Sequence, residues 1–294
     1  MAKARIIIKR RKAVRNIRKI TKVMQMIATA RYQKAFKRAI GTRPYVQKIG
    51  ELLASAAQSV RASGQNIDHP LLRDPAADKP VAVLVLTSNR GLAGGYNGNV
   101  LRLAGATLRD IEATGGKPAL LHVSGKKGTA AFRFQKREMA GTYTAISDNP
   151  KYAEIEELAT KFMQEYVEGK IAGLKLVFMR FISAGVQRAA VVDVLPLGGV
   201  SADEATTTPT AYEFSPDPAT LLAELIPTTV KITLFQAFIE AAVSEQIARM
   251  VAMKAATDAA DKMGKRLQQE YNRARQSQIT SELAELMGGV EAMK

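Results

Sequence analysis

The chain has 294 residues, of which 47% are hydrophobic and 24% are charged, so it can bury a core and is neither a disordered chain nor a mini-protein. It contains no cysteine and two histidines, which excludes a disulfide framework, a thiolate metal site and a cysteine nucleophile. The longest uninterrupted apolar stretch, residues 81–86, is far shorter than the roughly 18 to 20 residues that a membrane-spanning helix needs. We therefore expect a cytosolic-type globular chain without direct membrane insertion.

The net charge of +16 is concentrated at the N-terminal end. Residues 1–43 contain 15 Lys and Arg and no acid, whereas residues 44–227 contain 19 basic and 19 acidic residues and residues 228–294 contain nine and eight. Three interpretations compete: an organelle transit peptide, a nucleic-acid-binding helix and a solvated helix face. Transit peptides are rich in serine, but the first serine here is Ser55. Because 15 like charges repel one another, we expect an acidic partner.

The first 60 residues predict one long helix. Apolar residues step by four and three along it, a heptad-like stripe with cations on the other faces. The stripe consists of Ala13, Ile17, Ile20, Met24 and Ile27.

The middle of the chain, residues 70–227, alternates strand and helix signals. Strands are expected at residues 81–86, 119–123 and 139–146, with helices at 98–114 and 127–136. Asp148-Asn149-Pro150 predicts the start of a helix that runs to about residue 168. Two further strands, 174–182 and 188–195, form a hairpin, and residues 198–218 form a loop. This alternation predicts a doubly wound, Rossmann-like α/β domain.

Residues 228–294 contain no proline, which favours a second helix of about 60 residues. Its apolar stripe also steps by three or four: Ile247, Met250, Met253, Ala256, Ala260, Met263, Leu267, Tyr271 and Ala274. Two such helices that flank one domain predict an antiparallel coiled coil, since helices of this length need a partner. The alternative is two separate amphipathic helices packed on the α/β domain.

The glycine-rich segment 87–98 lies after the first strand and before a helix, where a doubly wound fold holds phosphate. Its spacing, G-x-x-G-G-x-x-G, matches neither the dinucleotide nor the P-loop pattern, so a tight packing turn competes with a nucleotide site. His69 is interpreted as a loop residue and His122 as a core histidine. No His and carboxylate cluster has metal-ligand spacing, so we expect no metal and no cofactor.

Three long segments of the sequence resemble motifs of a known protein family. Residues 17–30, 244–253 and 271–283 resemble the terminal helix signatures of the gamma subunit of the F-type rotary ATP synthases, bacterial type. The glycine-rich segment is similar to that family's Ser-Asp-Arg-Gly-Leu-Cys-Gly-Gly-Tyr-Asn, with Asn89 and Ala93 in place of the usual Asp and Cys. The resemblance covers nearly the whole chain.

The resemblance implies a non-catalytic central rotor stalk that couples proton (or sodium) flow to ATP synthesis or hydrolysis in the beta subunits. The implied partners are three alpha and three beta subunits, the epsilon subunit and the membrane c ring, with no nucleic acid. The implied location is the cytoplasmic face of the bacterial inner membrane, on which the complex is peripheral. The chain has no cysteine-based redox switch of the type found in chloroplast relatives, which favours a bacterial origin.

The resemblance also implies five coupling residues: Met24, Arg249, Arg275, Gln276 and Thr280. Arg275 and Gln276 would contact a beta catch loop, Met24 would lie beside the acidic beta lever, and Arg249 would belong to a supporting polar network. The alternatives are an ordinary coiled-coil core position for Met24 and a solvated face for the polar residues. Two other classes remain in competition, since a nucleic-acid-binding protein explains the charge and a nucleotide enzyme explains the middle of the chain.

Overall fold

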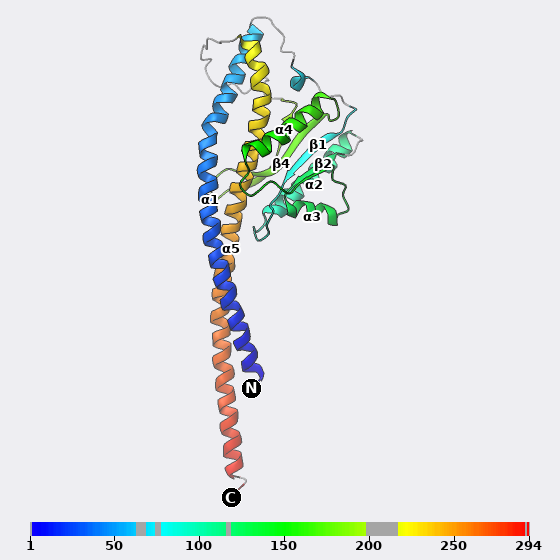
Figure 1. The fold of residues 1–294 in the computed structure, drawn as a ribbon. Coiled ribbons are helices and arrows are strands. Elements are labelled where there is room, and N and C mark those ends of the chain that lie inside the picture. Colours follow the sequence, from blue (N-terminus) through cyan, green and yellow to red (C-terminus); the bar gives the residue numbers. More distant parts are fainter. Residues whose placement is uncertain are drawn as a thin grey trace. The chain divides into compact units, whose positions relative to one another are not determined.

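The computed structural model describes residues 2–62, 69–73, 78–115, 119–197, 217–291 and 293. The chain divides into two compact units. The helix pair consists of Met1–Ala30 with Arg249–Lys294, and the α/β unit consists of Arg31–Ala248. Two long helices, α1 (Ala2–Ala62) and α5 (Pro218–Glu291), contribute to both units (Figure 1). The residues 198–216 of the predicted loop lie outside the described residues.

The α/β unit is built on one five-stranded sheet with the order β3-β2-β1-β4-β5. β1 lies in the centre and pairs in parallel with both β2 and β4, and only β5 is antiparallel. The chain therefore builds the sheet outward from β1 in both directions, as the predicted alternation of strands and helices requires. The strands are β1 (Val81–Leu86), β2 (Leu120–Ser124), β3 (Gly141–Tyr143), β4 (Gly173–Phe181) and β5 (Gln187–Leu195).

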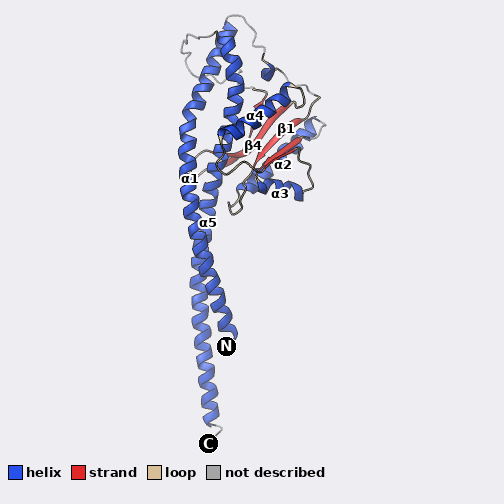
Figure 2. Ribbon diagram, in the orientation of Figure 1, coloured by secondary structure: helices blue, strands red, loops and turns tan. Residues whose placement is uncertain are grey.

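Helices cover both faces of this sheet (Figure 2). Helices α2 (Tyr96–Gly115) and α3 (Lys126–Phe134) pack on one face, where Val83 and Val85 of β1 point. Helix α4 (Tyr152–Val167) packs on the other face, together with the parts of α1 and α5 that belong to this unit. Leu84 of β1 and Phe162 of α4 are fully buried there. A short 3₁₀ helix, η1 (Pro70–Leu72), also contacts α4.

Every strand predicted in the middle of the chain is confirmed, but several ends differ. The third strand is shorter than expected, and α4 begins at Tyr152 rather than at the predicted Pro150. The helix starts later because Lys151 takes the N-cap position, where its backbone N–H donates to Glu154 Oε2 at 3.3 Å. Asn149, which the predicted start at Pro150 places at the cap, accepts a hydrogen bond from Arg38 at 2.8 Å instead, and Asp148 pairs with two arginines.

Helix α5 begins at Pro218, before the predicted Thr228, and passes through Pro227. A proline inside a helix costs about 3 kcal/mol. The neighbouring Leu222, Ile226 and Val230 are at most 1% exposed, so their burial in the core of the α/β unit offsets that cost. Among the described residues, α5 is the one helix whose length and apolarity would let it cross a membrane. Half of its apolar window is buried inside the protein, as in a core helix.

In the helix pair, polar contacts join α1 to α5 at several levels. Arg11 contacts Gln268, Arg18 pairs with Asp261, and Thr21 accepts a hydrogen bond from Thr257 Oγ1 at 2.8 Å. The residue numbers fall along α5 as they rise along α1, and the two segments lie side by side (Figure 1).

The apolar stripe predicted on α1 is wrong. Ala13, Ile17, Ile20 and Ile27 are exposed, and the side that is buried carries Ile7, Val14, Thr21 and Ala28 instead. That seam repeats every seven residues but contains a threonine and an alanine, so a search for large apolar residues selects the neighbouring face. On α5 the predicted stripe is largely confirmed, since Met253, Ala260 and Leu267 are buried, whereas Met263 is 55% exposed.

Candidate partner-binding surfaces

The five predicted coupling residues all lie in the helix pair, but they form two separate groups. Met24 is half-buried and lies one turn after Thr21, which belongs to the seam. Arg249 is 6% exposed, and burial at this level argues against a solvated face, because a buried guanidinium must be paired. Arg249 follows Ser244, Glu245 and Gln246, which are also buried, so this stretch of α5 is polar and buried.

Arg275, Gln276 and Thr280 form the second group, near the end of α5, and all three are exposed. Thr280 Oγ1 donates to the backbone oxygen of Gln276 at 3.0 Å, one helical turn earlier. At 1.5 Å per residue, Arg275 lies about 39 Å along the helix from Arg249. The structure therefore does not bring the two groups together.

The last turns of α5 extend past the N-terminal end of α1. The observed pairs, such as Arg18 with Asp261, place residue 277 opposite the first residues of α1. Beyond that level α5 carries exposed apolar side chains at helical spacing: Ile279 (46%), Leu283 (55%), Leu286 (68%) and Met287 (71%). Exposed apolar residues in a cluster indicate a surface that another molecule covers. Sequence reasoning missed this surface, although its spacing of four and three is visible.

A second exposed apolar face lies on α1. It is formed by Ile17 (52%), Ile20 (59%), Val23 (49%), Met26 (56%) and Ile27 (49%). Cations flank this face, and in the part of the chain that the structure describes several of them lack a carboxylate partner within the chain. The combination of apolar contact area and positive charge suits an apolar partner surface with an acidic rim.

The glycine-rich segment is a packing turn whose polar groups are used within the α/β unit. Asn89 accepts from the Lys126 backbone N–H at 3.2 Å and donates to the Ile146 oxygen at 2.9 Å. Thr87 Oγ1 accepts from the Gly128 N–H at 2.9 Å. Gly125 has φ +96°, and a Cβ there would lie 2.1 Å from the Thr87 oxygen. The amides at the start of α3 are therefore bonded to the glycine-rich segment and are not available to a phosphate.

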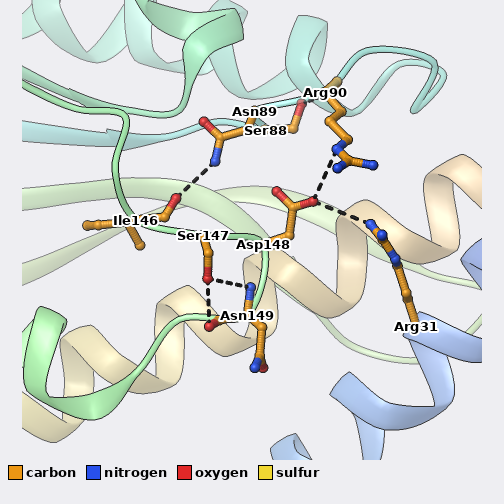
Figure 3. Close-up of polar contacts among 8 residues, drawn as sticks. All are labelled: Arg31, Ser88, Asn89, Arg90, Ile146, Ser147, Asp148 and Asn149. Carbon is orange, nitrogen blue, oxygen red and sulfur yellow. Dashed lines mark hydrogen bonds and ion pairs between the residues drawn. The ribbon is translucent and has the colours of Figure 1, made fainter.

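A cleft of about 550 Å³ opens beside this segment, within the α/β unit. Arg90, after β1, and Arg31, on α1, approach the carboxylate of Asp148 at 3.9 Å and 3.6 Å (Figure 3). Lys34 and Lys126 also line the cleft, which holds four cations and one carboxylate. The sequence reasoning did not find this cleft, because its residues come from five separate segments.

His122, interpreted from the sequence as a core histidine, is 3% exposed and packs edge-to-face on Phe162. Its Nδ1 lies 3.2 Å from the Tyr143 hydroxyl. Burial, and secondarily the charge of Lys161, lowers the pKa of His122 to about 4, so the ring is neutral at physiological pH. His69 lies at the N-cap of η1, where its Nδ1 accepts from the Leu71 N–H at 3.2 Å. Neither histidine is placed for acid–base chemistry.

Within the described ranges, no group of three or more His, Cys, Asp or Glu residues is arranged to hold a metal ion. The exposed features are instead contact surfaces along two long helices that share a doubly wound α/β domain. The geometry thus indicates the class of the molecule. It is a protein whose two long helices expose surfaces suited to binding other protein chains.

The chain belongs to the ATP synthase gamma chain family. The family model described as ATP synthase matches residues 3–293. The ATP synthase gamma chain of Rhodopirellula baltica is 42% identical over 300 residues, which cover 100% of both chains. The gamma chain of Saccharopolyspora erythraea is 38% identical over 308 residues, covering 100% of this chain and 98% of that protein.

Solved structures share the fold at low sequence identity. The rotor of the Euglena gracilis mitochondrial ATP synthase, in rotational state 1, superposes with a TM-score of 0.64 at 16% identity, covering 95% of this chain and 99% of that chain. A chain of the OSCP/F1/c-ring assembly from the same organism, in rotational state 3, gives a TM-score of 0.65 at 17% identity, covering 99% of this chain and 95% of that chain.

Proposed function

We propose that the chain is the central rotor stalk of an F-type ATP synthase and couples proton (or sodium) flow through the membrane sector to ATP synthesis or hydrolysis by rotation. The observation that carries this proposal is the helix pair of a gamma chain family member, which exposes apolar side chains on both helices and a high positive charge on α1. Such a shaft presents a different face to each of its neighbours when it turns.

The catalytic work in this proposal belongs to the beta subunits, and the chain itself is non-catalytic. Three alpha and three beta subunits surround the two helices. The epsilon subunit and the c ring bind at the α/β domain. The complex is peripheral on the cytoplasmic face of the bacterial inner membrane. The solved relatives are named as a rotor and as part of an F1 and c-ring assembly, which supports these partners.

In this proposal the chain divides into three functional parts. Residues 1–60 and 228–294 act as the two helices of an antiparallel coiled coil, and residues 70–227 act as the α/β foot. The opposite numbering of the contacts, such as Thr21 with Thr257, supports an antiparallel pair. The seven-residue repeat of buried residues on α1 supports supercoiling of the two helices.

The coupling mechanism follows from differential binding. Three chemically identical sites differ in affinity only if the shaft contacts each of them differently, because a partner shifts an equilibrium solely through its differential affinity for the two states. To move a site from mostly open to mostly closed takes about 5.5 kcal/mol of such difference. A few polar contacts and one apolar patch at the shaft surface are sufficient for this.

The five residues receive distinct roles in this proposal. Exposed Arg275 and Gln276 bind a beta catch loop, and Thr280 fixes their turn through its hydrogen bond to the Gln276 oxygen. Met24 lies at the edge of the helix seam, where it meets the acidic beta lever. Arg249 belongs to the buried polar stretch that holds the helix against its neighbours.

Co-purification tests the assembly directly. A tagged full-length chain, expressed in its native host, is expected to bring down alpha, beta, epsilon and c subunits, identified by mass spectrometry. Recovery of nucleic acid and no ATP synthase subunit would support the nucleic-acid-binding class instead. ATP turnover by the isolated chain would support the nucleotide enzyme.

Coupling is tested by truncation within the assembled complex. A chain that ends at Ala274 lacks the second group and the exposed apolar end. If contacts worth ~1.4 kcal/mol are lost, its affinity for the beta subunits should fall about tenfold, and its ATP yield per translocated ion should fall as well. A chain that ends after Met287 keeps Arg275 and Gln276 and serves as the matched control. Unchanged yield in the shorter chain would refute the roles given to these residues.

A further inference from the structure

We propose that the cleft in the α/β unit binds a small phosphate-bearing molecule. The cleft lies at the carboxyl ends of β1, β2 and β3, because Arg90 follows β1, Lys126 follows β2 and residues 144–149 follow β3. In open α/β sheets this edge is where ligands bind. The proposal concerns a site separate from the shaft contacts and does not rest on them.

The excess of positive charge in the cleft favours the binding of an anion. Arg31 and Lys34 lie one turn apart on α1, and Arg90 and Lys126 face them from the loops of the sheet. The one carboxylate, Asp148, lies between the two arginines at 3.6 Å and 3.9 Å, which is longer than a close ion pair (Figure 3). Two guanidinium groups and two ammonium groups around one opening match the several oxygens of a phosphate.

A buried amide marks the inner wall of the cleft. Gln246 lines the cleft and is 2% exposed, and its Oε1 has no hydrogen-bond partner among the described residues. An unsatisfied buried amide oxygen costs about 1–3 kcal/mol. A ligand with a hydroxyl or a protonated phosphate oxygen would satisfy it. The lining therefore suits a ligand that carries a hydrogen-bond donor as well as negative charge.

The size of the cleft favours a small molecule over an acidic protein segment. Its volume of about 550 Å³ lies within the range of small-molecule pockets, about 300–1,000 Å³. An acidic helix, about 10–12 Å wide, would contact the exposed Lys34 and Lys126 at the rim of the cleft. A phosphorylated hydroxyl compound is small enough to enter the cleft and would contact the Gln246 amide after a small shift of the wall side chains.

Calorimetric titration of the full-length chain with ADP tests the site, with pyrophosphate and a hexaglutamate peptide as comparison ligands. We expect one saturable site for ADP and weaker binding of the peptide. The double variant Lys34→Gln/Lys126→Gln should weaken ADP binding about tenfold or more, since it removes two charge-assisted contacts. The matched control, Lys37→Gln/Lys127→Gln, removes the same charge from neighbouring positions outside the cleft and should change binding less than about threefold.

Two further variants separate binding from folding. Gln246→Leu should raise the unfolding temperature, because it removes the unsatisfied oxygen, and should weaken ADP binding several-fold. Asp148→Asn should strengthen ADP and pyrophosphate binding, because the ligand no longer competes with a carboxylate for Arg31 and Arg90.

Three results would overturn the proposal: no saturable ADP binding, an equal loss in the two lysine double variants, or tighter binding of hexaglutamate than of ADP. The last result would identify an acidic protein segment as the occupant. The co-purification of ATP synthase subunits is unaffected by any of these results, so the test does not depend on the rotor assignment.

Discussion

The α/β unit and the helix pair are stabilised in different ways. In the α/β unit, whole side chains such as Leu84, Ile155 and Phe162 are removed from water, and helices cover both faces of the sheet. In the helix pair, the apolar cluster is small, and its members Ile7, Val14, Ala260 and Leu267 remain 8–9% exposed. The difference indicates that the α/β unit holds the main core of the chain, whereas the helix pair leaves much of its surface exposed.

The largest expected effect is a cavity in the α/β unit. Leu84→Ala should lower the free energy of unfolding by about 3–5 kcal/mol, because Leu84 is fully buried in the central strand. Leu267→Ala in the helix pair should cost about 2 kcal/mol, since its neighbours can relax around the smaller side chain. Urea unfolding followed by circular dichroism measures both values. Equal losses would contradict the difference between the two units.

The α/β unit should also lose stability in acid through His122. Its pKa is 6.5 in the unfolded chain and about 4 in the folded chain, so the unfolded state binds the proton more tightly. The resulting stabilisation is complete above pH 6.5 and is lost as the pH falls toward 4, by about 3 kcal/mol at most. Unfolding free energies measured across this range should lose this slope in His122→Phe. A His69→Gln control should keep it.

The polar pair in the helix seam should show coupling between its members. Thr257→Val leaves the Thr21 hydroxyl without its 2.8 Å partner and should cost about 1–2 kcal/mol. The double variant Thr21→Val/Thr257→Val buries two apolar groups and should recover most of this loss. The thermal unfolding of the four chains forms a double-mutant cycle. Additive effects would show that the hydroxyl pair does not join the helices.

The smallest expected effect concerns the surface ion pair of Arg18 with Asp261. Both side chains are about half-exposed, so Asp261→Asn should lower the unfolding free energy by less than about 1 kcal/mol, and the loss should vanish in 1 M salt. Asp258→Asn on the same helix removes an equal charge from an exposed position and serves as the control. A loss above 2 kcal/mol would place this pair among the main contacts of the helix pair.

Much of the α/β unit could be predicted because its signals are local. The apolar run 81–86 is β1, and the alternation after it gives β2, α3 and the β4–β5 hairpin. The start of α4 was not predictable from its cap motif, since Asn149 and Asp148 bind arginines that are distant in the sequence. The start of α5 was missed for a similar reason, because tertiary burial overrides Pro227.

The helix pair shows the opposite pattern, because its length was predictable and its buried face was not. Thr21 and Ala28 belong to the seam, whereas the larger Ile20 and Ile27 are exposed. Hydrophobicity alone does not distinguish a side chain of α1 that packs against α5 from one that a partner chain would cover. The same ambiguity explains why Leu283 and Leu286 were not recognised as a contact surface. The cleft was not predicted because five separate segments supply its residues.

Rotation of the chain inside the assembled complex tests the central claim most directly. Because the chain has no cysteine, Phe134→Cys at the 90% exposed end of α3 provides a unique site for a bead or fluorophore. With the alpha and beta subunits immobilised and ATP supplied, the label should turn in one direction in steps of a third of a turn. A label that stays fixed, or tumbles without direction, while ATP hydrolysis continues would contradict the account.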